Sequence, residues 1–268
     1  MSTVLREQAV KLPTGTTAQR PASPTIGFMR FNTTSNLLEY YNGSNWIDVN
    51  IFQPTSLSGL IGWYDTFSVS GTTWTDKSGS GNNATISGAT VVSTSGNGAA
   101  LLNQALHGSS TAHSVQFPAA IVPSTYTLFH VNRYTGGGSN LRILTSTTAS
   151  GTGFNWLSGH WAGNSGVAYH GGWLTPQTNI HGNNWVLSVD QNQLYRSNGV
   201  TRGTSGGATA SSGSGGDFSH CPSIGINSGS EQSTWMSAEI IVYNRTLPES
   251  EWRLVENYLA TKYGIALG

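Results

Sequence analysis

The residues that carry the most chemistry in this sequence are aromatic rings and imidazoles gathered between positions 156 and 173. Sugars expose patches of C–H groups that stack on aromatic faces, and nearby polar groups take up the sugar hydroxyls. Six such side chains fall in this stretch, interleaved with glycine and asparagine: Trp156, His160, Trp161, Tyr169, His170 and Trp173. The stretch therefore indicates a carbohydrate-binding surface.

Strand alternation divides these rings between two faces. Side chains two positions apart on a strand share a face, so His160 points away from Trp161, and Tyr169 opposes His170. At least half of the rings are then expected in the core, where large aromatic side chains are commonly buried. We predict that His160, Tyr169, His170 and Trp173 form the rim of a glycan site, and core packing is the alternative for the same residues.

The spacing of carboxylates argues against a glycoside hydrolase. Retaining hydrolysis needs two carboxylates about 5–5.5 Å apart, which on one strand would read as Glu-x-Asp-x-Glu or a similar run. No such run occurs, and no acidic residue lies between Asp76 and Asp190, although that region supplies the middle strands. We therefore expect no enzyme. A carboxylate pair assembled from distant strands is the alternative, and nothing in the sequence suggests one.

Oxygen donors for a metal ion gather near the start of the large domain. Asp65, Asp76, Asn82 and Asn83 carry the oxygen ligands that calcium prefers. The same residue types are common in turns because their side chains hydrogen-bond the turn backbone, and we favour this second interpretation. The seven histidines are scattered and show no His-x-x-x-His spacing. We therefore expect no metal centre and no other cofactor.

Composition limits the partners. Only 9% of the 268 residues are charged, and twelve Lys and Arg balance twelve Asp and Glu. A surface without net charge creates no field that attracts nucleic acid or an anionic membrane. No run has the length of a membrane span, and the N-terminal residues lack the apolar core of a signal peptide. We expect synthesis in a cytoplasm, with neither nucleic acid nor a membrane as partner.

The elements that must position these residues are short strands separated by turn clusters over residues 56–268, which is typical of a sandwich or jelly roll. A helix is expected after Pro248, because Trp252, Val255, Leu259 and Tyr263 form one apolar stripe and Gly264 suits its end. Residues 203–217 read as a flexible loop, and the single Cys221 as a small buried residue. The predicted strands are 59–65, 84–86, 100–102, 113–117, 126–133, 140–145, 155–161, 167–170, 185–190, 193–200 (with a hairpin turn at Asn198-Gly199), 223–227 and 237–244.

Two segments of this large domain resemble laminin-G-like, concanavalin-A-like lectin domains. The first is W-x-D-x-S-G-x-G-N, which runs from Trp74 to Asn82. The second begins at Glu239 as E-I-x-x-Y-N-R-x-L and continues into a helix that ends in K-Y-G at Gly264. The resemblance implies an all-β, concanavalin-A-like jelly-roll sandwich with one short C-terminal helix.

Residues 1–55 differ in composition from the rest. A proline-rich segment over residues 12–24 predicts an extended or polyproline-like arm, and strands at 27–32, 37–41 and 45–49 predict a small three-stranded meander. A meander of this size buries little surface by itself and needs a partner. The sequence therefore divides into an N-terminal module, 1–55, and a lectin-like domain, 56–268.

The N-terminal module resembles a recurrent module of tailed-phage virion proteins, T-A-x-R-P-x-x-P-x-x-G-x-x-R-[FY]-N-T followed by E-x-Y-x-G-x-x-W. The matching residues are Thr17, Ala18, Arg20, Pro21, Pro24, Gly27, Arg30, Phe31, Asn32, Thr33, Glu39, Tyr41, Gly43 and Trp46.

This second resemblance implies a structural protein on a virion surface, such as a capsid decoration or a short head or tail fibre. Its partners would be other virion proteins, further copies in a homotrimer and a host-surface glycan. The attachment residues would be Arg20, Pro21, Phe28, Arg30, Phe31, Glu39, Tyr41 and Trp46. Two alternatives stay open: a hairpin that only caps the sandwich edge, and a soluble carbohydrate-binding module without a virion role.

Overall fold

The computed structural model describes residues 11–35, 37–49, 52–119, 121–146, 155–204 and 224–268. The chain forms two compact units, Met1–Phe52 and Gln53–Gly268. Cys221 and the predicted loop, from residue 205 onward, lie outside the described residues. No helix in the described ranges is long and apolar enough to cross a membrane.

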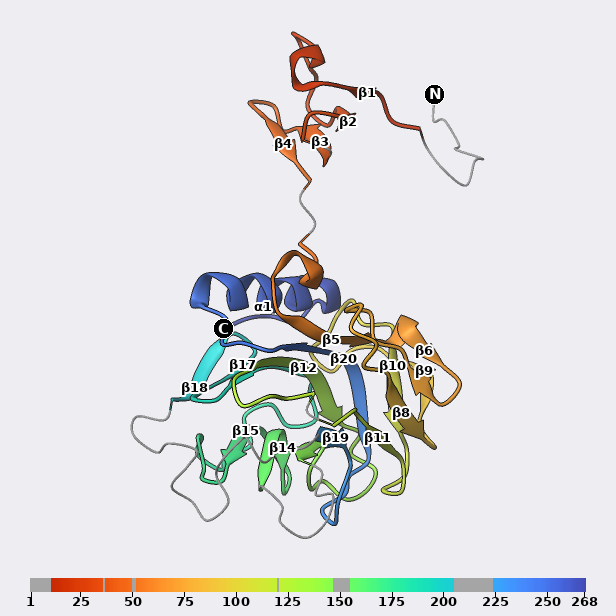
Figure 1. Cartoon of the computed structure of the whole chain (residues 1–268), viewed down its shortest axis with the longest axis vertical. Coiled ribbons are helices and arrows are strands. Elements are labelled where there is room, and N and C mark those ends of the chain that lie inside the picture. The colour runs from red at the N-terminus through yellow and green to blue at the C-terminus, as the bar shows by residue number, and fades with distance from the viewer. Residues whose placement is uncertain (1–10, 36, 50–51, 120, 147–154, 205–223) are drawn as a thin grey trace. The chain divides into compact units, whose positions relative to one another are not determined.

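Two eight-stranded antiparallel sheets face each other in the larger unit (Figure 1). The first sheet consists of β5 (Leu60–Asp65), β9 (Thr90–Ser93), β10 (Gln104–Gly108), β12 (Thr127–Tyr134), β16 (Val186–Gln191), β17 (Leu194–Ser197), β18 (Val200–Thr204) and β20 (Trp235–Tyr243). Its order is β18-β17-β16-β12-β20-β10-β9, and β5 also pairs with β20. The second sheet consists of β6 (Val69–Ser70), β7 (Thr73–Trp74), β8 (Ala84–Ser87), β11 (Ser114–Gln116), β13 (Leu144–Ser146), β14 (Trp156–Trp161), β15 (Asn164–His170) and β19 (Ile224–Ile226). Its order is β15-β14-β13-β19-β11-β8-β7-β6.

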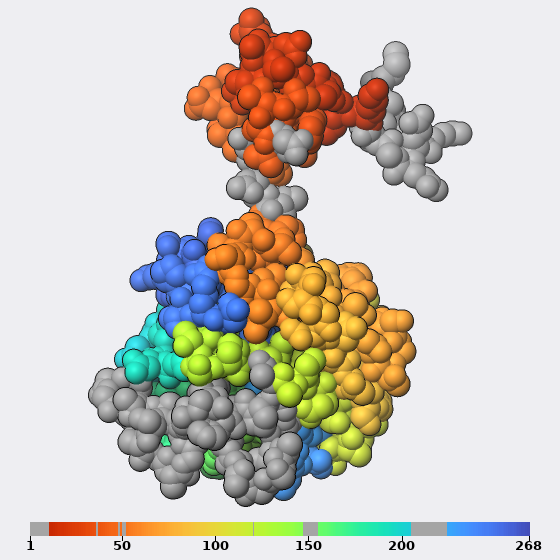
Figure 2. All heavy atoms as spheres, in the orientation of Figure 1, coloured from red at the N-terminus to blue at the C-terminus, as the bar shows by residue number. Residues whose placement is uncertain are grey.

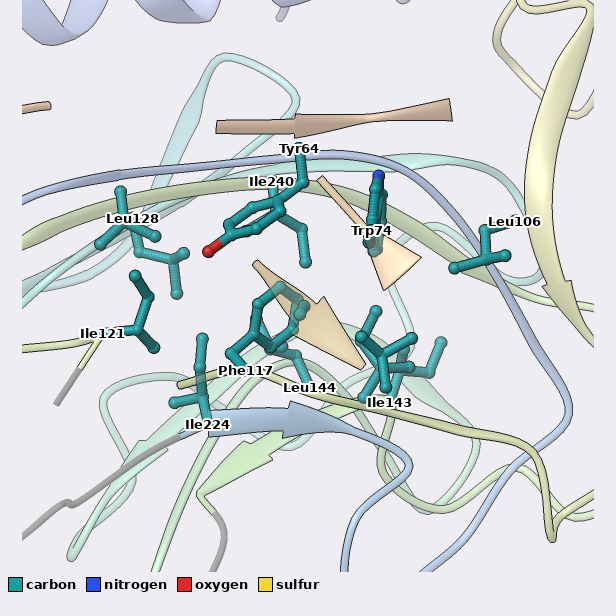
Figure 3. Packing of buried hydrophobic residues seen from close by; sticks show 14 of the residues in the cluster. Tyr64, Trp74, Leu106, Phe117, Ile121, Leu128, Ile143, Leu144, Ile224 and Ile240 are labelled. Carbon is teal, nitrogen blue, oxygen red and sulfur yellow. The ribbon is translucent and has the colours of Figure 1, made fainter. Parts of the chain in front are cut away.

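The hydrophobic core lies between the two sheets (Figure 3). Tyr64 of β5 packs edge-on against Trp74 and Phe117, with ring centroids 5.8 and 5.0 Å apart. Ile240 of β20 and Ile224 of β19 come from opposite sheets and are both fully buried. Each such side chain contributes roughly 1.5–3 kcal/mol when it leaves water, so this core is the main source of stability. The predicted jelly-roll sandwich is confirmed.

One α-helix, α1 (Glu249–Tyr263), occurs among the described residues and packs against β12 and β16 on the outer face of the first sheet. Its buried residues include the predicted stripe of Trp252, Val255, Leu259 and Tyr263. Gly264 ends it with φ of 65°, a left-handed conformation that suits glycine. In Figure 2 the blue atoms of α1 lie beside the orange atoms of the segment that leads into β5.

The predicted strand over residues 100–102 is wrong. The backbone N–H of Ala100 donates to Gly264 O (3.1 Å), and that of Leu101 donates to Tyr263 O (3.0 Å). The segment therefore satisfies carbonyls at the end of α1, which have no partner within the helix. The strand that does form here is β10, which begins at Gln104 and mixes polar and apolar residues.

The smaller unit has a four-stranded sheet in the order β1-β2-β3-β4. Its strands are β1 (Thr14–Gly15), β2 (Met29–Asn32), β3 (Leu37–Tyr41) and β4 (Trp46–Asp48). The prediction of a three-stranded meander with a polyproline-like arm is therefore wrong in one respect. The arm adds β1 parallel to β2, because Pro13 O and Gly15 O accept the N–H groups of Phe31 and Thr33. After β1 the arm forms a 3-10 turn, η1 (Thr17–Gln19).

Candidate carbohydrate-binding site

The strands β14 and β15 form a hairpin at the edge of the second sheet, away from α1 (Figure 1). Its turn is Ala162-Gly163, both with positive φ (48° and 81°), a conformation typical of tight two-residue hairpin turns. The cross-strand pairs Leu157↔Tyr169 and Trp161↔Asn164 fix which side chains share a face. Trp161 and Tyr169 lie on the face that turns away from the core.

Three aromatic rings meet on this outer face: Trp161, Tyr169 and Trp173, hereafter the aromatic cluster. The rings of Trp161 and Trp173 lie edge to face at 5.0 Å, and those of Tyr169 and Trp173 at 5.2 Å. The chain returns after β15 through a Tyr169↔Trp173 bridge, which places Trp173 between the other two rings. All three residues are half-buried, so each keeps some contact with solvent.

Polar groups adjoin the aromatic cluster. The Trp161 Nε1–H donates to Glu231 Oε1 (3.1 Å), and Glu231 is paired with Arg142 Nε at 2.6 Å. Arg142 Nη1 also donates to the exposed Asn155 Oδ1 at 2.7 Å. Aromatic faces beside a carboxylate, a guanidinium and an amide can stack a sugar ring and hydrogen-bond its hydroxyls.

The structure places the four predicted rim residues differently. Tyr169 and Trp173 lie in the aromatic cluster, whereas His160 and His170 are 0% and 2% exposed. His160 packs edge-on against Tyr134 at 4.7 Å, and His170 stacks on Trp156 at 5.8 Å. Burial lowers the pKa of His160 well below its usual value, so the imidazole is neutral. Neither histidine can form a rim, and the prediction is wrong for both.

Sequence reasoning did not select Trp161, Glu231 or Arg142. The alternation argument did assign Trp161 and His160 to opposite faces, as observed. Alternation could not show which of the two faces packs against the other sheet. Glu231 lies seventy residues from Trp161 in the sequence, so no local spacing brings the two together.

The turn with calcium-type donors is occupied by hydrogen bonds of its own. Asp76 Oδ1 accepts the N–H groups of Trp63 and Ser78, and Oδ2 accepts that of Asn82 at 3.0 Å. Asn83 Oδ1 accepts the Asp76 N–H at 2.9 Å. Asp65 lies against Lys77 Nζ at 2.7 Å, where a second cation would be repelled. These residues do not fit a calcium ion.

Two carboxylates from distant strands do come together, contrary to expectation. Asp65 of β5 and Glu239 of β20 are cross-strand partners, 2% and 0% exposed. Lys262 Nζ of α1 reaches both, at 3.4 Å from Asp65 and 2.6 Å from Glu239. Glu239 also accepts hydrogen bonds from Trp63 Nε1 (2.6 Å) and Tyr263 OH (2.5 Å). The pair lies beneath α1 and holds the helix on the sheet, and the adjoining rings of Trp63 and Tyr263 are themselves buried.

The motif residues of the smaller unit form an ion cluster within that unit. Glu39 is fully buried and accepts from Arg20 Nη2 (2.6 Å), while Arg30 Nε lies 3.6 Å from its other oxygen. Asn32 Nδ2 donates to Glu39 at 3.0 Å, and both guanidinium groups lie 6.0 Å from the Trp46 ring centroid. The remaining predicted attachment residues divide by exposure: Pro21 and Phe28 are exposed, and Phe31 and Tyr41 are half-buried.

Comparison with known proteins shows likeness in fold alone. No model of a protein family matches the chain, and no curated protein matches its sequence. A Trypanosoma rangeli sialidase in complex with sialic acid superposes with a TM-score of 0.53 at 15% identity, over 76% of this chain and 33% of that one. The chain thus spans about a third of the sialidase. Domain 4 of AbnA, a GH43 extracellular arabinanase from Geobacillus stearothermophilus solved with arabinotriose, gives 0.51 at 15% identity, over 74% and 97%.

Proposed function

We propose that the larger unit is a carbohydrate-binding module and that the aromatic cluster is its sugar-stacking surface. The observation that carries the proposal is the meeting of Trp161, Tyr169 and Trp173, all partly exposed, beside the Glu231–Arg142 pair. The likeness to domain 4 of the arabinanase, solved with arabinotriose, supports it at the level of fold. In this proposal the sandwich binds saccharide without transforming it, since the Asp65–Glu239 carboxylate pair is buried under α1.

We further propose that this module is displayed on a virion, as a capsid decoration or short head or tail fibre. The support is the sequence resemblance of residues 17–46 to phage virion modules. In this proposal the smaller unit attaches the chain to other virion proteins and joins it to further copies, as a homotrimer. The sandwich then faces outward toward host-surface glycans.

A glycan array tests the binding proposal. The full chain should bind at least one saccharide class, and Trp173→Ala should weaken binding about tenfold or more, because Trp173 contacts both other rings. Trp161→Ala should weaken it similarly. The matched control is Phe67→Ala, since Phe67 is an aromatic residue 74% exposed on another part of the sandwich. Equal loss in the control, or undiminished binding in both tryptophan variants, would exclude the aromatic cluster as the site.

The virion proposal has a separate test. An antibody raised against the sandwich should label intact phage particles from an infected culture in electron micrographs. Unlabelled particles, with the protein recovered only in the soluble fraction, would favour the second candidate function, a soluble carbohydrate-binding module. The glycan array does not depend on this outcome.

A further inference from the structure

The two faces of the small sheet are covered unequally. Side chains alternate along β2, β3 and β4, so Arg30, Glu39 and Trp46 share one face. The arm covers this face: Arg20 pairs with Glu39, and Thr16 O accepts from Arg30 Nη2 at 3.0 Å. The arm therefore supplies one covering layer, over the side of the sheet that carries the charges.

The opposite face is apolar and, among the described residues, partly exposed. Met29, Tyr40 and Ile47 are direct neighbours across β2, β3 and β4, and they are 45%, 38% and 37% exposed. The adjacent pair Phe31↔Leu38 extends the same face and is half-buried. We call these five residues the apolar face. No charged residue lies among them.

A sheet with such a face lacks half of its core. Stable domains bury the apolar side of a sheet against a second layer, and units of about 40–60 residues are marginal even when they do. What this unit buries instead is the Glu39 ion cluster, and buried ion pairs add little net stability because desolvation offsets their attraction. The apolar side of this sheet therefore still has surface whose burial would stabilise the unit.

We infer that the apolar face packs against the same face in further copies of this chain. A surface that pairs with itself must tolerate its own charges at close range, and this one has none, so no like-charge repulsion opposes the contact. Packing of these faces against one another also supplies the missing layer. The inference rests on the proposed attachment role of the smaller unit and names the surface that it uses.

The sandwich of the same chain is a poorer occupant. Its exposed large apolar residues stand singly on separate elements, and single exposed residues are ordinary on protein surfaces: Phe67, Val91, Leu101, Ile180, Leu254 and Leu267. The apolar face also differs from the attachment residues expected from the sequence. Arg20, Arg30, Glu39 and Trp46 hold the unit together, and among the eight only Phe31 belongs to the apolar face.

The test is the mass of the full chain in solution, measured by light scattering and sedimentation. The wild-type chain should be an oligomer, and Tyr40→Lys and Ile47→Lys should each shift it to monomer by placing a cation at the centre of the contact. Ile26→Lys is the matched control, because Ile26 is 70% exposed in the turn before β2, outside the apolar face, and the variant should leave the mass unchanged. Circular dichroism of each variant checks that the chain stays folded, and a more conservative Ile47→Ala should weaken association without removing it.

A monomeric wild-type chain over the whole concentration range would overturn the inference. So would an oligomer that Tyr40→Lys and Ile47→Lys leave intact, or one that only Ile26→Lys dissociates. A dimer or a trimer lost in the lysine variants would support it. The glycan array separates the two proposals. A monomeric chain that still binds sugar would overturn the interface and leave the carbohydrate-binding function supported. An oligomeric chain that binds no sugar would leave the interface supported and overturn the carbohydrate-binding function.

Discussion

Glu39 and Glu239 occupy equivalent positions in two units of very different size. Each is fully buried, each accepts from cationic side chains, and each lies beside a tryptophan, Trp46 or Trp63. Glu239 lies next to a core of two eight-stranded sheets, whereas Glu39 has only a four-stranded sheet and an arm around it. Both glutamates belong to the motifs that suggested function from the sequence. The comparison teaches that these two motif glutamates hold a fold together and line no exposed surface.

The largest expected effect is that of Glu239→Gln. The amide would place a donor where the carboxylate accepts from Lys262, Trp63 and Tyr263, and would leave Lys262 only the more distant Asp65, at 3.4 Å, of its two carboxylate partners. We expect a loss of about 3 kcal/mol in the free energy of unfolding, as is usual when one partner of a buried pair is removed. Urea unfolding followed by circular dichroism measures it. A loss no greater than that of a surface variant would show that the helix is held by apolar packing alone.

Acid should distinguish the two units. Burial lowers the pKa of His130 to about 4, and burial together with Arg202 lowers that of His181 to about 4. Only the unfolded chain then binds these protons as the pH falls from about 6.5 toward 4, so the sandwich should lose stability in that window, by on the order of 3 kcal/mol for the fully buried His130.

The smaller unit has no histidine and should not respond in that window. Hydrogen bonding to Arg20 lowers the pKa of Glu39 below 4.5, so this unit loses stability only as the pH falls through that lowered value. Hydrogen exchange measured by mass spectrometry at stepped pH reports both units in one chain. If residues 11–49 began to exchange faster at a higher pH than the sandwich strands do, the sandwich would not be the more acid-sensitive unit and the prediction would be contradicted.

Glu39→Gln should cost less than Glu239→Gln in absolute terms, about 1–3 kcal/mol, because a thin covering leaves more solvent screening around the ion cluster. This loss should nevertheless destabilise the smaller unit as a whole more than Glu239→Gln destabilises the sandwich, because the smaller unit has less stability to lose. We expect faster hydrogen exchange throughout β2, β3 and β4, with the sandwich strands unchanged. Exchange confined to the neighbours of residue 39 would show that the small sheet is stable without its ion cluster.

The smallest effect is expected for Glu249→Gln. Glu249 pairs with Arg253 at 2.6 Å, but their side chains are 64% and 53% exposed. Exposed pairs of this kind contribute less than about 0.5 kcal/mol. The variant is therefore the matched control for both buried glutamates in urea unfolding, and a loss equal to that of Glu239→Gln would make burial irrelevant to the comparison.

Sequence patterns predicted the elements whose periodicity is set by one clear apolar face. The stripe on α1 and the Asn198-Gly199 turn are of this kind, and both are confirmed. Strand β1 was missed because its two residues, Thr14 and Gly15, are too few to show a periodicity. Their partners in β2, Phe31 and Asn32, also lie too far along the chain for a local pattern to pair them. Segment 100–102 has an apolar run, but its backbone N–H groups hydrogen-bond to the end of α1. No local sequence pattern predicts a contact with a helix so far along the chain.

The candidate site was predicted in part for the same reason. Alternation sorts β14 and β15 into two faces correctly, yet both faces carry rings, so the pattern cannot say which one turns inward. Tyr169 and Trp173 were selected and are half-exposed, whereas His160 and His170 were selected and are in the core. Only the packing of the second sheet on the first decides between them.

The position of β20 has a consequence for synthesis on the ribosome. This strand pairs with β5, β10 and β12, although its residues, Trp235–Tyr243, are translated after all three. Until then, three strands present open backbone edges that can pair with another nascent chain. The small sheet needs only residues 14–48 and can form well before. A stalled or truncated chain would therefore carry a finished small sheet ahead of an unfinished, aggregation-prone sandwich.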